Sequence, residues 1–230
     1  MGTFVLLHGA YQGGWIFQPV AARLGAAGHR TYRPTLDGCG ERRSGLRAGI
    51  TTESHGAEVA DLLFYEDLRD VTLVGTSSGG MVLCRAAELA RERVGRVVFV
   101  DALALRDGER IADFVQRPTA TTTELATGPS EQDARTRLFG DLDAELRDWA
   151  LARYTMHPRG PMEEPVRLER FWDLPWSAQV IYCTRSVNPP EAHQRRTAAA
   201  LGASWAELDT GHYPMLSMPD ELAELLIAGA

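Results

Sequence analysis

A short serine motif flanked by glycines offers the clearest chemistry in the chain. Residues 75–79 read Gly-Thr-Ser-Ser-Gly, so Ser77 has a glycine two positions before it and another two positions after it. This spacing suits a serine on a sharp turn from a strand to a helix, where larger neighbours would collide. Ser78 lacks the spacing, because Thr76 stands two positions before it. We therefore predict Ser77 as a nucleophile, and we expect the Ser78 backbone N–H to face an anion.

A serine hydroxyl needs a base, and His212 is the best placed of the six histidines. It follows the last predicted strand in the segment Asp-Thr-Gly-His-Tyr, residues 209–213, close to the end of the printed sequence. The order serine, acid, histidine along the chain is typical of the fold that carries such a serine turn. We predict His212 as the base. For His8 we expect a structural role, and for the other four histidines surface or core roles: His29, His55, His157 and His193.

A glycine-rich segment follows His8, at the end of the first predicted strand. Its small residues let the backbone approach a bound substrate closely. We expect the N–H of Ala10, together with that of Ser78, to stabilise a developing alkoxide.

Apolar runs and helical patterns alternate along the chain, which predicts an α/β fold of one domain. The sheet should be mostly parallel and open, with about six strands and helices on both faces. Strands are predicted at residues 3–8, 29–33, 71–75, 96–101, 179–183 and 204–208, and helices at 17–27, 53–65, 81–91, 190–201 and 219–228.

The segment at residues 102–176, called the cap below, interrupts this alternation. It shows helical patterns and no convincing buried strand, and we expect it to be a helical insertion over the carboxyl ends of the strands, where open α/β sheets bind ligands. Aromatic residues there, near the glycine-rich loop and directly after His212 are candidate substrate contacts, although burial alone also explains them. The candidates are Tyr11, Trp15, Trp149, Tyr154 and Tyr213.

Composition excludes several classes of function. The net charge of −7 argues against nucleic acid and anionic membrane surfaces as partners. The chain has no lysine, which excludes a catalytic lysine or a Schiff base. Its three cysteines have unrelated spacings, which predicts neither a disulfide framework nor a metal site. We expect no signal peptide, no membrane span and a cytoplasmic protein.

These motifs resemble the α/β-hydrolase family, and within it the small esterase and hydroxynitrile-lyase branch that includes plant salicylate methyl esterases. The resemblance covers most of the chain and is weakest in the cap. It rests on Phe-Val-Leu-Leu-His-Gly-Ala at residues 4–10, Gly-Gly-Trp at 13–15, Pro-Thr-Leu at 34–36, Gly-Glu-Arg at 40–42, the serine turn, Val-Asp-Ala at 100–102 and Asp-Thr-Gly-His at 209–212. It implies a serine nucleophile and no cofactor.

The chain departs from this branch at the acid of the triad. Family members commonly carry an aspartate after the next-to-last strand, where residues 185–190 here read Arg-Ser-Val-Asn-Pro-Pro. Some members place the acid after the strand that follows the serine helix, and Asp101 stands there. We predict Asp101 as the acid, with Asn188, Ser186 or no acid as the alternatives. A second departure, Thr76 where relatives often have histidine, is expected to alter the floor of the pocket.

We thus expect a serine hydrolase that cleaves a small or medium carboxylic ester, thioester or lactone. One alternative is a hydroxynitrile lyase, which in this branch uses a lysine after the catalytic histidine, where this chain has Tyr213. Another is a receptor on the same fold that has lost turnover. The arginine- and alanine-rich composition suggests a GC-rich bacterial genome and secondary metabolism. The sequence leaves a homodimer open.

Overall fold

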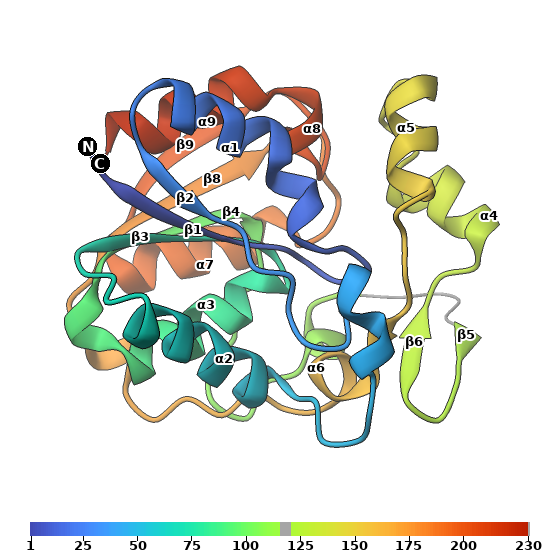
Figure 1. Cartoon of the computed structure of the whole chain (residues 1–230), viewed down its shortest axis with the longest axis horizontal. Coiled ribbons are helices and arrows are strands. Elements are labelled where there is room, and N and C mark those ends of the chain that lie inside the picture. The colour runs from blue at the N-terminus through green and yellow to red at the C-terminus, as the bar shows by residue number, and fades with distance from the viewer. Residues whose placement is uncertain (116–120, 230) are drawn as a thin grey trace.

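The computed structural model describes residues 1–115 and 121–229. Six parallel strands form the large sheet, in the order β2-β1-β3-β4-β8-β9 (Figure 1). This confirms the predicted parallel sheet of about six strands. The strands are β1 (Thr3–Leu7), β2 (Arg30–Tyr32), β3 (Val71–Ser77), β4 (Val94–Ala102), β8 (Ser177–Cys183) and β9 (Ser204–Leu208).

Helices cover both faces of this sheet. On one face α1, α8 and α9 lie together, and on the other α2, α3 and α7 (Figure 1). Pro19 stands in the first turn of α1, and Thr51 caps α2 by accepting from the Ser54 N–H at 3.2 Å, so local sequence signals start both helices. Their bounds are α1 (Gln18–Ala26), α2 (Thr52–Tyr65), α3 (Gly79–Leu89), α7 (Glu191–Leu201), α8 (Pro214–Ser217) and α9 (Pro219–Ala228).

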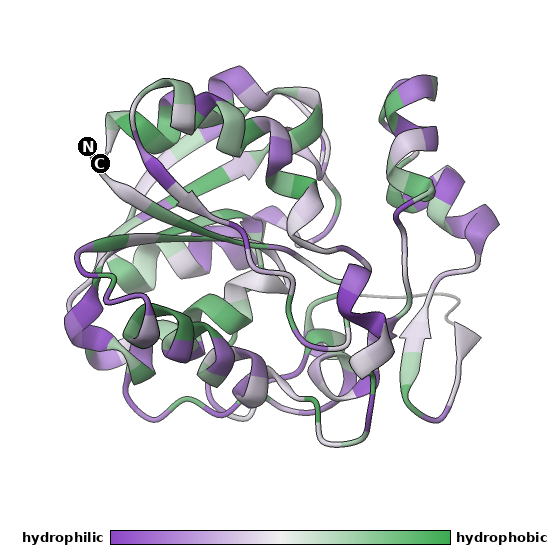
Figure 2. Ribbon diagram, in the orientation of Figure 1, coloured by the Kyte–Doolittle hydropathy of each residue, from purple (hydrophilic) through white to green (hydrophobic). Residues whose placement is uncertain are grey.

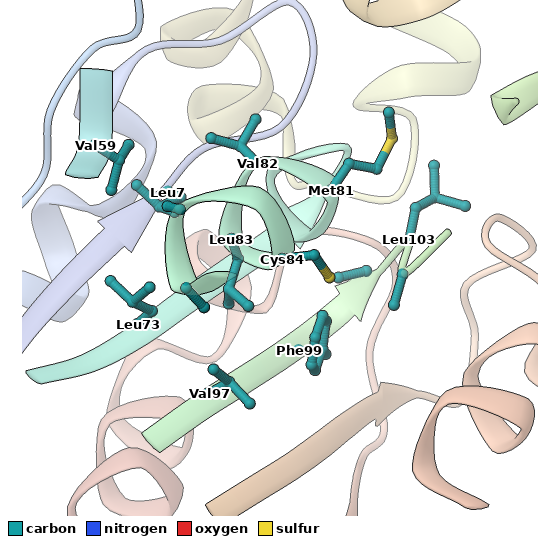
Figure 3. Close-up of a cluster of buried hydrophobic side chains, with 14 of the residues drawn as sticks. Leu7, Val59, Leu73, Met81, Val82, Leu83, Cys84, Val97, Phe99 and Leu103 are labelled. Carbon is teal, nitrogen blue, oxygen red and sulfur yellow. The ribbon is translucent and has the colours of Figure 1, made fainter. Parts of the chain in front are cut away.

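Two hydrophobic clusters, one on each face, hold the layers together. Hydrophobic colours follow the central strands, whereas α4 in the cap is largely hydrophilic (Figure 2). Leu83 and Cys84 on α3 pack toward Val97 and Phe99 on β4 (Figure 3). All four are at most 1% exposed. This packing fixes α3 against the strands, and therefore fixes the turn that leads into it.

The cap connects β4 to β8, two strands that pair directly in the large sheet. It contains α4 (Glu131–Asp133), a π-helical turn (Ala134–Leu138), α5 (Ala144–Leu151) and α6 (Arg159–Glu163). It also contains a small antiparallel sheet of β5 (Thr121–Thr122), β6 (Ala126–Gly128) and β7 (His157–Pro158). The sequence shows helical patterns and no convincing buried strand in this segment, whereas β6 and β7 are buried. These strands have two or three residues each, too few for a period-two pattern to appear in the sequence.

None of the helices within residues 1–115 and 121–229 is both long enough and apolar enough to span a membrane.

Candidate active site

Ser77 ends β3 in a conformation that most side chains avoid. Its φ is 51°, in the left-handed region, and the next residues begin α3. A Cβ at Gly79 would lie 2.5 Å from the carbonyl oxygen of Leu7, which is why only glycine fits there. The carbonyl of Ser77 accepts from the Leu103 N–H at 2.9 Å. The predicted sharp turn is thus present, and backbone contacts on both sides hold it.

Asp101 lies at the end of β4, beside Ser77, at an irregularity of the sheet. Thr76 pairs with Val100 but Ser77 pairs with Ala102, so the register passes over Asp101. Asp101 also has a positive φ, 44°. A bulge of this kind redirects the side chain of the extra residue. Here it leaves the Asp101 carboxylate fully buried, with 0% exposure.

His212 meets this carboxylate from the loop after β9. Its Nδ1 lies 2.5 Å from Asp101 Oδ2. Because a carboxylate only accepts hydrogen bonds, Nδ1 must be the donor. In the neutral ring, Nε2 is then left as the acceptor, the state in which an imidazole can take a proton from a hydroxyl. The His212 side chain is 19% exposed, so it reaches the open space above the sheet.

Ala10 and Ser78 line the same space. Within the described part of the chain, neither the Ala10 N–H nor the Ser78 N–H donates a hydrogen bond to another protein group. A Cβ at Gly9 would lie 2.7 Å from the Cβ of Ser77, so the glycine lets the loop that carries Ala10 pass directly against the serine. The role of these two amides in binding an oxyanion stays a prediction.

His8 has a structural place under this loop, as expected. Its Nε2 accepts from the Leu36 N–H at 3.1 Å, and its Nδ1 lies 2.8 Å from the Gly9 carbonyl. Burial lowers the pKa of His8 to about 4, so the ring is neutral and carries both bonds at neutral pH.

A cavity of about 370 Å³ joins these groups. Ser77, His212, Ala10 and Ser78 all line it. Much of the remaining wall is apolar and includes Leu103, Ile111, Val115, Leu138 and Met162, while Arg137, Asp141, Arg185 and Asn188 add polar groups.

Of the five aromatic residues predicted to contact substrate, Tyr11 lines this cavity. The other four lie outside its lining because they pack against protein groups. Trp15 and Trp149 contact each other edge to face, with ring centroids 5.3 Å apart. Tyr154 donates its hydroxyl to the Pro129 carbonyl at 2.7 Å. Tyr213 is 1% exposed and packs on Phe139.

The alternatives to Asp101 have other partners. Ser186 and Asn188 line the cavity, but the Ser186 hydroxyl donates to the Asn188 carbonyl at 3.2 Å. Glu191, the nearest carboxylate after β8, begins α7 and pairs with Arg195 at 2.6 Å. Thr76 is buried and is not part of the cavity wall, so the expectation that it alters the pocket floor was wrong.

Gln194 was missed by the sequence analysis. Its Nε2 donates to Asp101 Oδ1 at 2.6 Å from the second turn of α7. A single glutamine in a helix forms no pattern, so no sequence signal pointed to it.

Comparison with known proteins identifies the family. Residues 4–225 match the model of the alpha/beta hydrolase family. A carbendazim hydrolyzing esterase of a Nocardioides species is 30% identical over 99% of both chains. An alpha-hydroxynitrile lyase of Arabidopsis thaliana is 31% identical over 98% of this chain and 95% of its own.

Among solved structures, an extracellular α/β-hydrolase from a Paenibacillus species superposes with a TM-score of 0.86. It shares 23% identity and covers 100% of this chain and 99% of its own. Its description reports structural and functional homology to the tobacco salicylic acid binding protein 2. The match at residues 4–225 includes the large sheet except for Thr3 of β1, together with Ser77, Asp101 and His212, and the protein belongs to the α/β-hydrolase family.

Proposed function

We propose that the protein is a carboxylesterase in which Ser77 is the nucleophile, His212 the general base and Asp101 the residue that orients His212. The observation that carries this proposal is the 2.5 Å hydrogen bond from His212 Nδ1 to Asp101 Oδ2, at the wall of a cavity that Ser77 also lines. Esterases among the relatives support the reaction class.

The proposed reaction has two steps. Ser77 Oγ attacks the ester carbonyl carbon while His212 Nε2 takes the hydroxyl proton, and the N–H groups of Ala10 and Ser78 hold the oxyanion. His212 then gives that proton to the alcohol oxygen, and the bond from the carbonyl carbon to this oxygen breaks. Water, deprotonated by His212, attacks the acyl-enzyme and releases the acid, and Ser77 regains its proton.

The cavity favours a small or medium ester with an apolar or aromatic part. Its volume of about 370 Å³ lies near the lower end of the usual range for ligand sites. Leu103, Ile111 and Met162 offer an apolar wall to such a group. Since one relative hydrolyses carbendazim, that compound belongs in a substrate panel.

The test compares the native protein with Ser77→Ala on p-nitrophenyl esters of increasing chain length. We expect Ser77→Ala to lower kcat by a factor on the order of 10⁴ or more, because the nucleophile is lost. Ser177→Ala, an exposed serine outside the cavity wall, is the control and should keep native activity. Equal hydrolysis by native protein and Ser77→Ala would remove Ser77 from the mechanism.

Labelling by a fluorophosphonate probe separates this enzyme from a receptor on the same fold. We expect one equivalent of probe on native protein and none on Ser77→Ala. An unlabelled native protein would favour the receptor.

A hydroxynitrile lyase is the weaker candidate, although one relative carries that name. The chain has no lysine, and Tyr213, after His212, is buried with its pKa raised by that burial. Cyanide release from mandelonitrile measures this activity directly, and we expect none above the rate without protein.

We also propose that the protein comes from a bacterium and is cytoplasmic. Cys39, Cys84 and Cys183 are all free and buried, which suits a reducing compartment. Because one similar structure is described as extracellular, fractionation of cells that express the tagged chain is the deciding measurement.

A further inference from the structure

The Asp101 carboxylate is buried with few donors around it. Within residues 1–115 and 121–229, it accepts two side-chain hydrogen bonds, one from His212 to Oδ2 and one from Gln194 to Oδ1. No arginine pairs with it in that part of the chain. A buried carboxylate depends strongly on each hydrogen bond that stabilises its charge.

Gln194 is held so that its amide nitrogen faces Asp101. The side chain is 1% exposed, and Nε2 donates both to Asp101 Oδ1 at 2.6 Å and to the Pro189 carbonyl at 3.1 Å. Both neighbours are acceptors, so a flipped amide would place its oxygen against two other oxygens. The orientation of the amide is therefore fixed.

In this arrangement, the carbonyl oxygen of the same amide has no hydrogen bond to the described part of the chain. Gln194 Oε1 is buried and has no hydrogen-bond partner within the described residues. A glutamine placed only to join α7 to its surroundings would be expected to satisfy both ends of its amide. Gln194 leaves its own acceptor unsatisfied while it supplies a donor to Asp101.

We propose that Gln194 is a positioning residue for catalysis: its Nε2–H holds the Asp101 carboxylate in place, so that Asp101 can orient His212. This inference rests on the proposed function. Gln194 does not line the cavity, so it acts through Asp101 and does not contact substrate. The loop at residues 185–190 has no aspartate, but its Pro189 carbonyl accepts a hydrogen bond from Gln194 Nε2 and so helps to hold the amide that contacts Asp101.

The test is a cycle of Gln194→Met, Asp101→Asn and the double variant on a p-nitrophenyl ester. Methionine keeps the length of the side chain and removes the donor. We expect Gln194→Met to lower kcat by about 10- to 100-fold with KM unchanged, as for a lost hydrogen bond to a charged group. In the Asp101→Asn background, it should change kcat by no more than about twofold, because the charge it serves is absent.

Thr197→Val is the matched control. Thr197 lies on the same helix, is 1% exposed, and donates its hydroxyl to the His193 carbonyl at 3.1 Å. The variant loses one buried hydrogen bond of α7 without touching Asp101, and we expect native kcat. If it lowers kcat as much as Gln194→Met does, the role of Gln194 is structural and the inference is overturned.

The pH profile of kcat/KM provides a second readout. Without the donor, the negative charge of the Asp101 carboxylate loses one of its two hydrogen bonds. We expect the acidic limb of the profile to move to higher pH. Other titratable groups near Asp101 are Tyr182, Cys183 and Tyr213, whose pKa values burial raises. The Asp141 carboxylate lies against Gly211, next to His212.

The outcomes separate the two proposals. Native kcat in Asp101→Asn would overturn the role of Asp101, and with it the role of Gln194. A large loss in Asp101→Asn with native kcat and an unshifted profile in Gln194→Met would overturn the role of Gln194 alone. If Gln194→Met does not fold, Gln194→Glu keeps the shape, replaces the donor with a carboxyl group, and should move the acidic limb in the same direction.

Discussion

At the carboxyl ends of β3 and β4, backbone geometry places the reactive groups, whereas in the cap the side chains of short elements form the cavity wall. Ser77 and Asp101 both have positive φ angles, and the loop after β1 adds Tyr11, with a φ of 69°. These are three of the five non-glycine residues with positive φ in the described chain. Strained backbone therefore concentrates at the sheet side of the cavity, as is common at functional sites.

The cap has the opposite character. Its strands and most of its helical turns have five residues or fewer, and its contribution to the cavity comes from side chains such as Ile111, Leu138 and Met162. Side chains are replaced more easily than strained backbone is rebuilt. We infer that the sheet side sets the reaction and the cap sets the substrate, and the experiments below test this division.

Paired alanine substitutions at glycines of the two regions should give the largest contrast. At Gly79 a Cβ would meet the backbone oxygens of Leu7 and His8, at 2.5 and 2.6 Å, so β1 and α3 must move apart. We expect Gly79→Ala to lower the free energy of unfolding by about 1–3 kcal/mol. Because the oxyanion loop follows β1, kcat should fall by about 10²-fold.

At Gly128 in the cap, the nearest atom to an added Cβ is the Tyr154 hydroxyl oxygen, at 2.4 Å, which belongs to the end of a half-buried side chain and not to the backbone. Gly128→Ala should mainly change KM, through the Tyr11 ring 3.4 Å from the added carbon. Chemical unfolding and steady-state kinetics measure both effects. A Gly79→Ala variant with native kcat would contradict the role assigned to the sheet side.

Acid should destabilise the protein through two buried histidines outside the cap, His8 after β1 and His193 on α7. Burial lowers the pKa values of His8 and His193 to about 4, below the ordinary 6.5. The folded state then binds protons at these two histidines less readily than the unfolded state does. The contribution of the neutral histidines to the free energy of unfolding is therefore complete above pH 6.5 and is lost as the pH falls toward 4. The loss at pH 4.5 should be about 2–3 kcal/mol for each histidine.

Urea unfolding at pH 7.5 and 4.5 measures this loss, with His193→Gln as the comparison. His193 Nε2 accepts from the Ala104 N–H at 3.0 Å, and a glutamine has an acceptor that does not titrate in this range. The variant should lose less stability between the two pH values than the native protein does. An equal loss in both would mean that His193 is not a source of the acid sensitivity.

The sequence predicts the large sheet and its reactive groups better than it predicts the cap. Each strand of the large sheet and each long helix falls within a few residues of its predicted range, because the apolar runs are long and the flanking glycines and prolines are distinct. Ser77 and His212 were predicted from a glycine pattern and from chain order, and both line one cavity. Asp101 was chosen by position, and its contact with His212 depends on a bulge that has no sequence signature.

The residues that sequence reasoning missed act through tertiary contacts. Gln194 approaches Asp101 although 93 positions separate them. The aromatic residues of the cap gave a strong signal, yet Trp149 and Tyr154 pack within the protein, whereas less conspicuous residues such as Leu103 and Val115 line the cavity. Hydrophobic side chains serve burial and ligand contact equally well, so composition alone does not separate the two roles.

The smallest expected effect concerns substrate choice within the cap. Met162 on α6 is 4% exposed and lines the cavity, so Met162→Ala should enlarge the cavity on its apolar side. We expect the ratio of kcat/KM for a long-chain to a short-chain p-nitrophenyl ester to rise about tenfold, the usual value of a methylene or two in an apolar pocket. Leu168→Ala removes a buried cap residue outside the cavity wall, 7% exposed, and should destabilise the protein without changing this ratio. Both variants lose apolar burial, so a rise in the ratio for Met162→Ala alone would show that the cap wall determines substrate choice. An unchanged ratio in Met162→Ala would indicate that the sheet side determines it.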